Sequence, residues 1–411
     1  MRFEKYDIAP EIKENLNIMG FKRPTDIQFK AIPLILDGED LLAIAQTGTG
    51  KTAAFVIPVL EILFYQNKTS PFDGIKSVVM APTHELALQI TEVFKSIGKN
   101  TGIVTLCVHG GVEQQAQIDQ LEKGIDILVA TPGRMFDLVS QGFIKLNTVG
   151  LLVLDEADHM LDLGFLKDIQ DLIRYLPRKR QTLFFSATIN EEIKKLAYSL
   201  VHSPVRIQIS PKNPVAKNIN HSVAFIAMDD KRFFLERLIN ENAESKILVF
   251  VRTKVRAERV CKALERINIK SLTIHGDKVH DDRTLAMNMF RKGDVKVLIA
   301  TDVSARGIDI PDVDYVVNYD LPEQVENYVH RVGRTGRADK KGNAVSFCSA
   351  EEKEILAEIE NYLDKPIKVL DISKNEYNKT LDFTEDTDNN WKALLLEDAN
   401  SDKGKKKKKK K

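Results

Sequence analysis

The sequence has few cysteines, no long apolar run and almost no net charge, and each shortage excludes a class of protein. Its three cysteines, Cys107, Cys261 and Cys348, lie far apart and are odd in number. Neither a disulfide framework nor a zinc site therefore has its ligands close together in the sequence. No stretch of about 18 uncharged apolar residues occurs, and the charged N-terminus lacks the apolar core of a signal peptide. We expect a protein of the reducing cytoplasm, neither secreted nor membrane-spanning.

The formal net charge of +1 argues against a uniformly basic nucleic-acid binder but leaves room for local positive grooves. Hydrophobic residues make up 43% of the chain and charged residues 29%, which is the mixture of a folded protein rather than a disordered one. The chain has 411 residues, too many for one ordinary core. A typical domain size of about 150 residues predicts two domains.

Two series of short apolar runs alternate with helix-length amphipathic stretches, which is typical of doubly wound parallel sheets. The first series is Asp40–Gln46, Ser77–Pro82, Val104–Val108, Ile125–Ala130, Leu151–Asp155 and Thr182–Ser186. The second is Ile247–Val251, Ser271–Ile274, Val295–Ala300, Tyr315–Asn318 and Ala344–Cys348. A polar stretch with two prolines separates them. The sequence predicts an α/β protein with domains at residues 1–209 and 218–370, a linker at 210–217 and a polar tail at 371–411.

A phosphate-binding pattern, Ala-Gln-Thr-Gly-Thr-Gly-Lys-Thr, ends the first apolar run and precedes a helical stretch. Its glycines let backbone N–H groups approach phosphate oxygens, Lys51 reaches the β- and γ-phosphates, and the Thr52 hydroxyl can bind Mg²⁺. Ala45 stands where the general pattern has its first glycine. A glycine-rich turn with an incidental lysine is the plainer interpretation. The predicted nucleotide-binding residues here are Ala45, Gln46, Thr47, Gly48, Thr49, Gly50, Lys51 and Thr52.

An acidic motif, Asp155–Asp158, follows the apolar run Leu151–Leu154. In an open α/β sheet the carboxyl ends of the strands form the ligand crevice. Asp155 is placed to hold Mg²⁺ together with Thr52, and Glu156 to orient and deprotonate the water that attacks the γ-phosphate. A solvated acidic loop would explain the charges but not the phosphate-binding pattern earlier in the same series. ATP hydrolysis is the better interpretation.

From Phe3 to about Ile372, the order of the motifs resembles that of the DEAD-box RNA helicase family, particularly its short-tailed bacterial members. The resemblance implies two tandem RecA-like domains that close over ATP and single-stranded RNA. Gly20–Gln28 resembles the family's Q motif, which implies that Gln28 reads the adenine edge and Phe21 stacks on its face, with Phe3 as the upstream aromatic. An amide suits adenine because it both donates and accepts. The plainer alternative is a helix cap followed by a surface glutamine.

Two segments of the second domain also resemble family motifs. His330–Arg337 resembles the arginine-finger motif, which implies that Arg334 and Arg337 stabilise charge developing on the γ-phosphate. Ala300–Asp309 resembles the motif that contacts both ligands, which places Gly307 and Asp309 at the nucleotide. Plainer alternatives are a basic surface patch and an acidic turn.

The predicted catalytic residues are then Lys51, Glu156, Arg334 and Arg337. The residues implied to couple the ATP and RNA sites are Ser186, Thr188, Asp302 and His330, with the first two hydroxyls bonded to Asp155–Asp158.

The family's RNA-facing motifs correspond to strand-end segments, where small residues and backbone N–H groups suit phosphates and 2′-hydroxyl contacts distinguish RNA from DNA. The residues implied to bind RNA are Pro82, Thr83, His84, Gly110, Gly111, Thr131, Pro132, Gly133, Arg134, Arg252, Thr253, Arg283 and Thr301. His84 stands where the family usually has arginine, and His280 where glutamine is usual. We therefore expect weaker or more pH-dependent RNA binding.

The resemblance implies an ATP-dependent RNA helicase that uses ATP and Mg²⁺, binds RNA without sequence preference, and separates short duplexes or remodels RNA–protein complexes. An ATP-gated RNA clamp would use the same motifs, whereas a DNA translocase would lack the Q motif.

Lys405–Lys411 is either a solubilising end or an electrostatic arm for RNA. Trp391–Leu396 is either a partner-binding helix or an apolar segment docked on its own chain. Ribosome-assembly and RNA-decay proteins stay open as partners.

Overall fold

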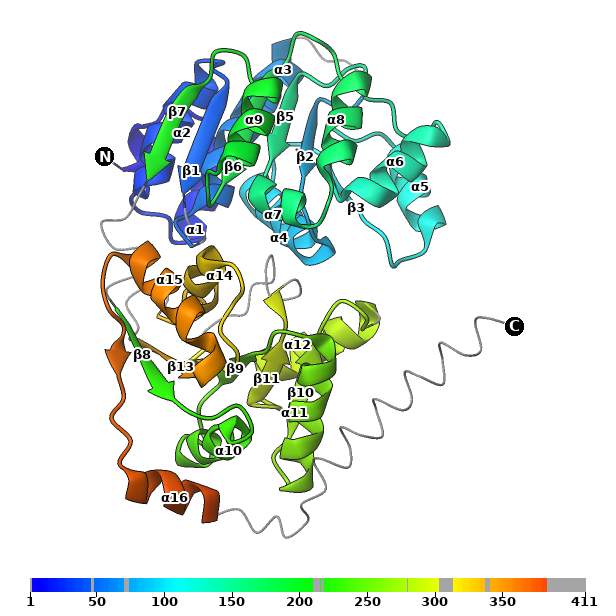
Figure 1. The fold of residues 1–411 in the computed structure, drawn as a ribbon. Helices are drawn as coiled ribbons and strands as arrows, with labels where there is room; N and C mark the ends of the chain where they lie inside the picture. Colours follow the sequence, from blue (N-terminus) through cyan, green and yellow to red (C-terminus); the bar gives the residue numbers. More distant parts are fainter. Residues whose placement is uncertain are drawn as a thin grey trace.

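The computed structural model describes residues 2–45, 48–69, 74–209, 215, 218–278, 280–302, 313–336 and 341–382, except for the side chains of His280, Asp281 and Asp382. Two α/β domains lie one above the other (Figure 1), each built on a seven-stranded sheet. The predicted fold class is confirmed. Among the helices of the described residues, none combines the length and the apolar character that a membrane span requires.

The first sheet has the strand order β3-β4-β2-β5-β6-β1-β7, with every neighbour parallel. Its strands are β1 (Leu41–Ala45), β2 (Ser77–Met80), β3 (Thr105–Val108), β4 (Ile127–Ala130), β5 (Leu151–Leu154), β6 (Gln181–Ser186) and β7 (Val205–Ile209). Because β6 lies between β1 and β5, the carboxyl ends of these three strands meet at one edge of the sheet. That edge gathers motifs that are far apart in the sequence.

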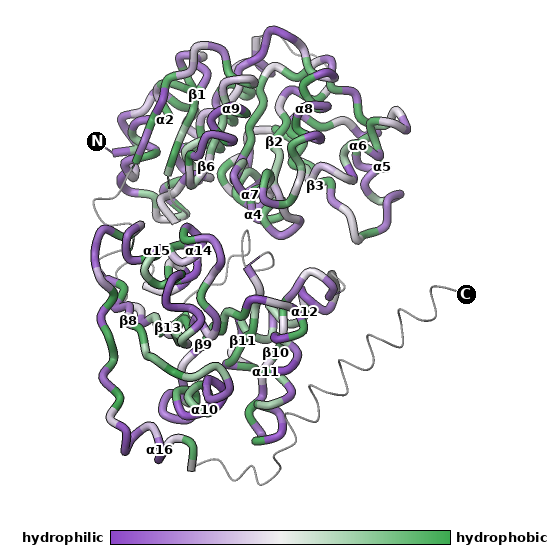
Figure 2. Tube along the Cα trace, viewed as in Figure 1, coloured by the Kyte–Doolittle hydropathy of each residue, from purple (hydrophilic) through white to green (hydrophobic). Residues whose placement is uncertain are grey.

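Helices cover both faces of this sheet, which explains why its strands read as uninterrupted apolar runs. Successive residues of β1 alternate between two cores, with Leu41 and Ala43 in one and Leu42 in the other. Around the first core lie η1 (Phe3–Lys5), α1 (Pro10–Ile18), α2 (Asp26–Leu36), α3 (Lys51–Thr69) and α4 (His84–Ile97). Around the second lie α5 (Gln114–Glu122), α6 (Pro132–Ser140), α7 (Ala157–Asp162), α8 (Leu166–Tyr175) and α9 (Glu191–Leu200). Figure 2 shows apolar strands inside more hydrophilic surroundings.

The second sheet has the order β10-β11-β9-β12-β13-β8-β14, again with parallel neighbours. Its strands are β8 (Ile219–Phe225), β9 (Ile247–Phe250), β10 (Ser271–Ile274), β11 (Val297–Ala300), β12 (Tyr315–Asn318), β13 (Gly342–Cys348) and β14 (Lys368–Val369). The apolar pattern does not reveal β8, whose centre is polar at Asn220, His221 and Ser222. It does not reveal β14 either, because that strand has only two residues.

The helices around the second sheet are α10 (Lys231–Glu241), α11 (Lys254–Arg266), α12 (His280–Lys292), α14 (Val325–Val332), η2 (Ala350–Glu352), α15 (Lys353–Leu363) and α16 (Lys374–Asp382). Helix α16 lies in the range predicted as a polar tail, so that prediction is wrong for residues 374–382. Tyr377 Oη donates to Asp230 Oδ2 (2.7 Å), and the Tyr377 and Phe234 rings are 4.9 Å apart. The helix has few apolar residues and gives too weak a periodic signal to be found from the sequence.

Of the predicted linker, only the buried Val215 is described.

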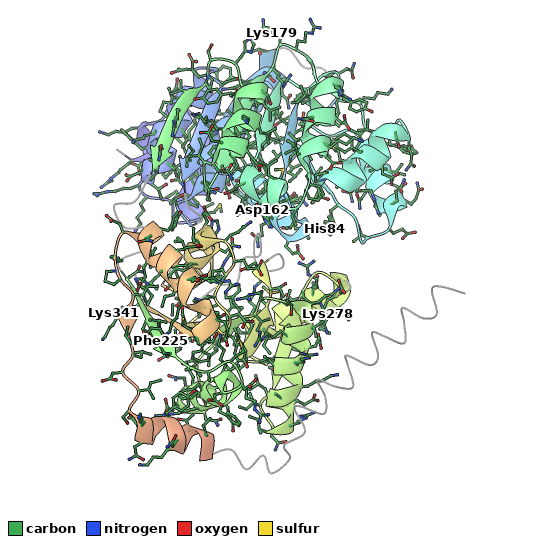
Figure 3. The ribbon with its side chains drawn as sticks, viewed as in Figure 1. His84, Asp162, Lys179, Phe225, Lys278 and Lys341 are labelled. Atoms are coloured by element: carbon green, nitrogen blue, oxygen red, sulfur yellow. The ribbon has the colours of Figure 1, made fainter. Side chains whose placement is uncertain are left out.

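The two domains touch through an ion pair between α12 and α4. Arg283 Nη2 lies 2.7 Å from Glu85 Oε1, and both side chains are mostly buried. Figure 3 shows His84 and Asp162 on the side of the first domain that faces the second. The start of α4, which carries His84 of the predicted RNA-binding residues, therefore lies where the domains meet.

Candidate functional site

The phosphate-binding pattern forms the turn between β1 and α3. Gly48 and Gly50 have φ angles of +81° and +89°, a left-handed conformation that glycine adopts without strain. A Cβ on Gly50 would lie 2.5 Å from Gln28 Nε2, so this glycine also permits close packing. A glycine turn that leads into a helix N-terminus is the geometry that binds phosphate. Gln46 and Thr47 lie outside the described residues.

Lys51 supplies the positive charge of this turn. Its side chain is buried, and its Nζ has no hydrogen-bond partner within the described part of the chain. A buried, unpaired ammonium group is costly, so this one fits a bound anion. Its charge also acts on Asp155 and Glu156 at the end of strand β5, which β6 separates from β1. Thr52 follows on α3 and is half-buried.

The two acidic side chains that follow β5, Asp155 and Glu156, are almost completely buried. Burial raises the pKa of Asp155 to about 7 against the opposing charge of Lys51. Burial also tends to raise the pKa of Glu156, but the neighbouring His159, Lys51 and Arg334 outweigh it and lower that pKa to about 2. His159 Nδ1 lies 3.5 Å from Glu156 Oε2. Asp155 is therefore a carboxyl group that needs a cation, whereas Glu156 stays ionised.

The backbone of Glu156 is strained, because its φ of +52° lies in the left-handed region that non-glycine residues seldom occupy. The residue forms the N-cap of α7. Its amide N–H donates to Asp155 Oδ1 (3.0 Å), which fixes the Asp155 carboxyl group against the backbone of Glu156. Strain of this kind is retained where the surroundings hold a side chain in a required direction.

Asp158 joins the acidic motif to the segment after β6. Its Oδ2 accepts hydrogen bonds from the N–H groups of Ala187 (3.1 Å) and Thr188 (3.0 Å) and from Thr188 Oγ1 (3.1 Å). Ser186 Oγ instead donates to the carbonyl of Thr188 (2.7 Å). The prediction that both hydroxyls bond to the acidic motif is therefore wrong for Ser186, whose short side chain bonds within its own turn. A displacement of Asp158 would still move Ala187 and Thr188 with it.

The predicted adenine-reading residues pack against the phosphate turn. Gln28 on α2 is buried, its Oε1 accepts from Thr25 N (2.9 Å), and its Nε2 donates to Gly50 O (3.1 Å). It is therefore not a surface glutamine, and each end of its amide keeps one further hydrogen-bonding position for a ligand. Phe21 is half-buried, with its ring edge-on to Phe3 at 5.9 Å between centroids.

Arg334 reaches this site from the second domain. Its side chain is 5% exposed, and its charge is among those that lower the pKa of Glu156. The structure therefore brings together Lys51 and Glu156 of one domain and Arg334 of the other. The side chain of His330 is half-buried on α14. Among the nucleotide-binding residues predicted in the second domain, Gly307, Asp309 and Arg337 lie outside the described residues.

In the first domain, the predicted RNA-binding residues lie at strand ends, as expected. Thr83 Oγ1 caps α4 by accepting from Leu86 N (3.3 Å). The centroids of the His84 and His109 rings are 5.1 Å apart. A Cβ on Gly110 would lie 3.5 Å from the His84 ring. A pair of histidine rings, His84 and His109, therefore lies where the family usually has the fixed positive charge of an arginine.

A second group of predicted RNA-binding residues surrounds the start of α6. Pro132 is its first residue, after the buried Thr131. A Cβ on Gly133 would meet nothing within 4 Å, so the backbone there is approachable. Arg134 Nη2 donates to the carbonyl of Val112 (3.1 Å), which ties α6 to the turn containing Gly111, where φ is +77°.

In the second domain, the predicted RNA-binding arginines already have carboxylate partners. Arg252 Nη2 lies 3.3 Å from Glu352 Oε1, and Arg283 pairs with Glu85. Arg252 would therefore reach an RNA phosphate only in competition with Glu352, whereas Arg283 is held in the contact between the two domains. Thr253 Oγ1 accepts from Arg256 N (3.2 Å) at the start of α11. Thr301 follows β11 and is buried.

Sequence reasoning missed a set of buried polar residues behind these motifs. Lys231 is fully buried, and its Nζ donates to Glu352 Oε2 (2.5 Å) and to the carbonyl of Tyr319 (2.7 Å). Asn318 and Asp320 are likewise fully buried. In the sequence, Asn318 and Asp320 stand out only as polar residues at the end of an apolar run. This pattern does not show which residues they form hydrogen bonds with.

Residues 25–196 match a family model described as DEAD/DEAH box helicase, and residues 230–339 match one described as helicase conserved C-terminal domain. The chain is 39% identical over 382 residues to the DEAD-box ATP-dependent RNA helicase RhpA of Helicobacter pylori, covering 92% of this chain and 76% of that protein. It is 40% identical to the ATP-dependent RNA helicase RhlB of Shewanella frigidimarina, covering 91% and 87%.

Solved structures give the same result. The chain resembles S. cerevisiae Dbp5 bound to RNA and ADP BeF3 with a TM-score of 0.81 and 31% identity, covering 92% of this chain and 97% of that one. It resembles the DEAD-box helicase Mss116 bound to ssRNA and UDP-BeF with a TM-score of 0.82 and 29% identity, covering 93% and 82%.

Proposed function

Since this chain belongs to the DEAD-box family of ATP-dependent RNA helicases, we propose that its two domains close over ATP and one strand of RNA. The chain is an RNA-stimulated ATPase that couples ATP to RNA remodelling. One observation carries the assignment of its site: Lys51 of the first domain and Arg334 of the second act on the same buried Glu156 carboxylate. A γ-phosphate between them would join the domains.

ATP is recognised at both ends. Gln28 uses the free positions of its amide for the adenine edge, and Phe21 packs on the base. The turn from Ala45 to Thr52 holds the phosphates through backbone N–H groups and Lys51. The buried and unpaired Nζ of Lys51 supports this role. Gly307 and Asp309 complete the pocket on the ribose side.

The chemistry of the acidic pair fits a magnesium ion. Asp155 is a buried carboxyl group whose pKa is raised by burial, and Thr52 offers a hydroxyl oxygen from the phosphate turn. Oxygen ligands of this kind are those that Mg²⁺ prefers. Asp155 and Thr52 would hold the ion, which when bound offsets negative charge on the phosphates.

Hydrolysis depends on groups from both domains. Glu156, kept ionised by His159, Lys51 and Arg334, orients the attacking water and accepts its proton. Arg334 and Arg337 stabilise charge on the transferred phosphoryl group, because planar guanidinium groups match its oxygens. The arginines belong to the second domain, so hydrolysis requires closure.

RNA binds across the domains at the strand-end segments that carry His84, Gly110, Gly133 and Thr301. These contacts address the backbone, so base identity has little influence. ATP and RNA together stabilise the closed arrangement, in which one bound strand no longer fits a duplex, and product release reopens the domains.

All three cysteines are free thiols, which supports a cytoplasmic location.

A duplex-release assay tests this function. A short labelled RNA strand annealed to a longer one should be released with ATP and retained with ADP. A DNA duplex of the same sequence should stay intact. ATP-dependent RNA binding without strand release would instead show an ATP-gated clamp, and release of DNA would show a broader translocase.

A further inference from the structure

A fully buried arginine, Arg331, anchors the segment that carries the arginine finger. Its Nε and Nη2 bind the two carboxylate oxygens of Asp302 at 2.6 and 2.7 Å. Its Nη1 donates to the carbonyl of Asp320 (2.6 Å) and to Asn318 Oδ1 (3.3 Å), and the guanidinium lies 5.0 Å from the centre of the Phe250 ring. Its contacts thus come from the ends of three strands, β11, β12 and β9.

Asn318, the last residue of β12, is held in one orientation. Its Oδ1 accepts from Arg331, and its Nδ2 donates to Ser346 Oγ on the neighbouring strand β13 (3.0 Å). Asn318 and Ser346 are both completely buried. If the amide were reversed, its NH₂ group would face a cation, so Arg331 selects the orientation in which Oδ1 accepts from it and Nδ2 donates to Ser346.

The position of Arg331 determines that of Arg334. Helix α14 ends at Val332, and the next turn is closed by bonds from Gly333 N to Val329 O (2.9 Å), Arg334 N to Arg331 O (3.1 Å) and Thr335 N to Val332 O (3.2 Å). Arg334 is therefore bonded through its own amide to the residue that Asn318 fixes. Its charge reaches Glu156 in the other domain.

We propose that Asn318 is a positioning residue for Arg334: through Arg331 it fixes the turn that presents Arg334 to the γ-phosphate. The inference rests on the proposed function, because it requires Arg334 to act on ATP. An arginine that stabilises developing charge is sensitive to small displacements, since a shift of about 1 Å can cost roughly 100-fold in rate. Loss of Asn318 should then affect the transition state more than nucleotide binding.

The test compares the wild-type protein with Asn318→Ala, Asn318→Asp and the control Asn327→Ala. Asn327 is also buried and lies on α14, but its Nδ2 donates to Oε1 of Gln324 (3.5 Å), the N-cap residue of that helix. The rate constant kcat and the KM for ATP are measured at saturating RNA, with the melting temperature of each variant. Binding of ADP and of ADP with aluminium fluoride, a transition-state mimic, is measured on the same samples.

Asn318→Ala should lower kcat roughly 10- to 100-fold, while the KM and ADP affinity change less than about threefold. Its affinity for the aluminium fluoride complex should fall in step with kcat. Asn318→Asp keeps an acceptor towards Arg331 and should recover most of the turnover, and Asn327→Ala should turn over normally.

Three results would overturn the inference. A folded Asn318→Ala with wild-type kcat would leave Asn318 without influence on Arg334. Equal losses of kcat, ADP affinity and melting temperature in the Asn318→Ala and Asn327→Ala variants would reduce its role to general stability. A wild-type protein without RNA-stimulated hydrolysis would refute the proposed function itself, and this outcome is separable because it appears before any substitution.

Discussion

The ion pair between Glu85 and Arg283 gives the sharpest prediction about domain closure. The pair joins α4 of one domain to α12 of the other, with 2.7 Å between Oε1 and Nη2. It can form only when the domains are together. Replacing either residue by glutamine should therefore weaken the closed state and leave the separate domains unchanged.

The expected size follows from burial and geometry. The two side chains are 16% and 17% exposed. At an effective dielectric constant of about 20, unit charges 2.7 Å apart attract by about 6 kcal/mol, which is an upper bound because desolvation of both groups opposes it. Hydrogen bonds to charged groups contribute about 1.5–3 kcal/mol net. The two groups are close but poorly aligned for a hydrogen bond, so we take the lower end of this range of net contributions. A loss of about 1.5 kcal/mol corresponds to roughly tenfold in affinity.

The assay is fluorescence anisotropy of a labelled single-stranded RNA, with ADP–beryllium fluoride to favour closure and with ADP alone. Glu85→Gln and Arg283→Gln should each weaken binding about tenfold in the closed state, and the double variant should be no weaker than either. A control, Lys194→Gln, removes the exposed pair with Glu191 on α9 and should change nothing. Additive losses in the double variant would refute the coupling and show that Arg283 binds RNA independently of Glu85.

Three substitutions test individual residues of the site. Glu156→Gln should keep ATP binding, lower turnover by about 10² to 10⁴ and accumulate an RNA-bound state; single-turnover hydrolysis at the wild-type rate would remove its proposed role. Gln28→Ala breaks buried bonds to Thr25 and Gly50, so the KM for ATP should rise about tenfold and the preference for ATP over GTP should fall; an unchanged preference would contradict adenine reading. His84→Arg restores a fixed charge beside Gly110 and should tighten RNA binding by about 1 kcal/mol with a steeper salt dependence; an unchanged Kd would refute the argument.

The fold was predictable where burial is complete on both faces of a sheet. Leu151–Leu154 and Val297–Ala300 are apolar at every position because helices cover both sides, and such runs stand out in the sequence. Strand β8 and helix α16 do not stand out. β8 carries a polar centre that includes His221, whose Nδ1 bonds to Tyr328 Oη (3.0 Å), and α16 depends on Tyr377 reaching Asp230. Partners far away in the sequence decide these elements, and no local pattern reveals them.

The site was predictable to the extent that its residues follow strand ends in a fixed order. The sequence brings Lys51, Glu156 and Arg334 into one hypothesis, and the structure places their charges together. It does not reveal that Arg283 pairs with Glu85 or that Arg331 is held by Asp302 and Asn318. A buried polar residue looks like an exposed one in a sequence, because the difference lies in the tertiary contacts that satisfy it.

If ATP and RNA close the two domains together, RNA should determine the rate of ATP hydrolysis. The rate is measured at fixed salt with no nucleic acid, with single-stranded RNA and with DNA of the same sequence. Joint closure over ATP and RNA predicts strong stimulation by RNA and little by DNA. Equal stimulation by both, or no stimulation by RNA, would contradict it.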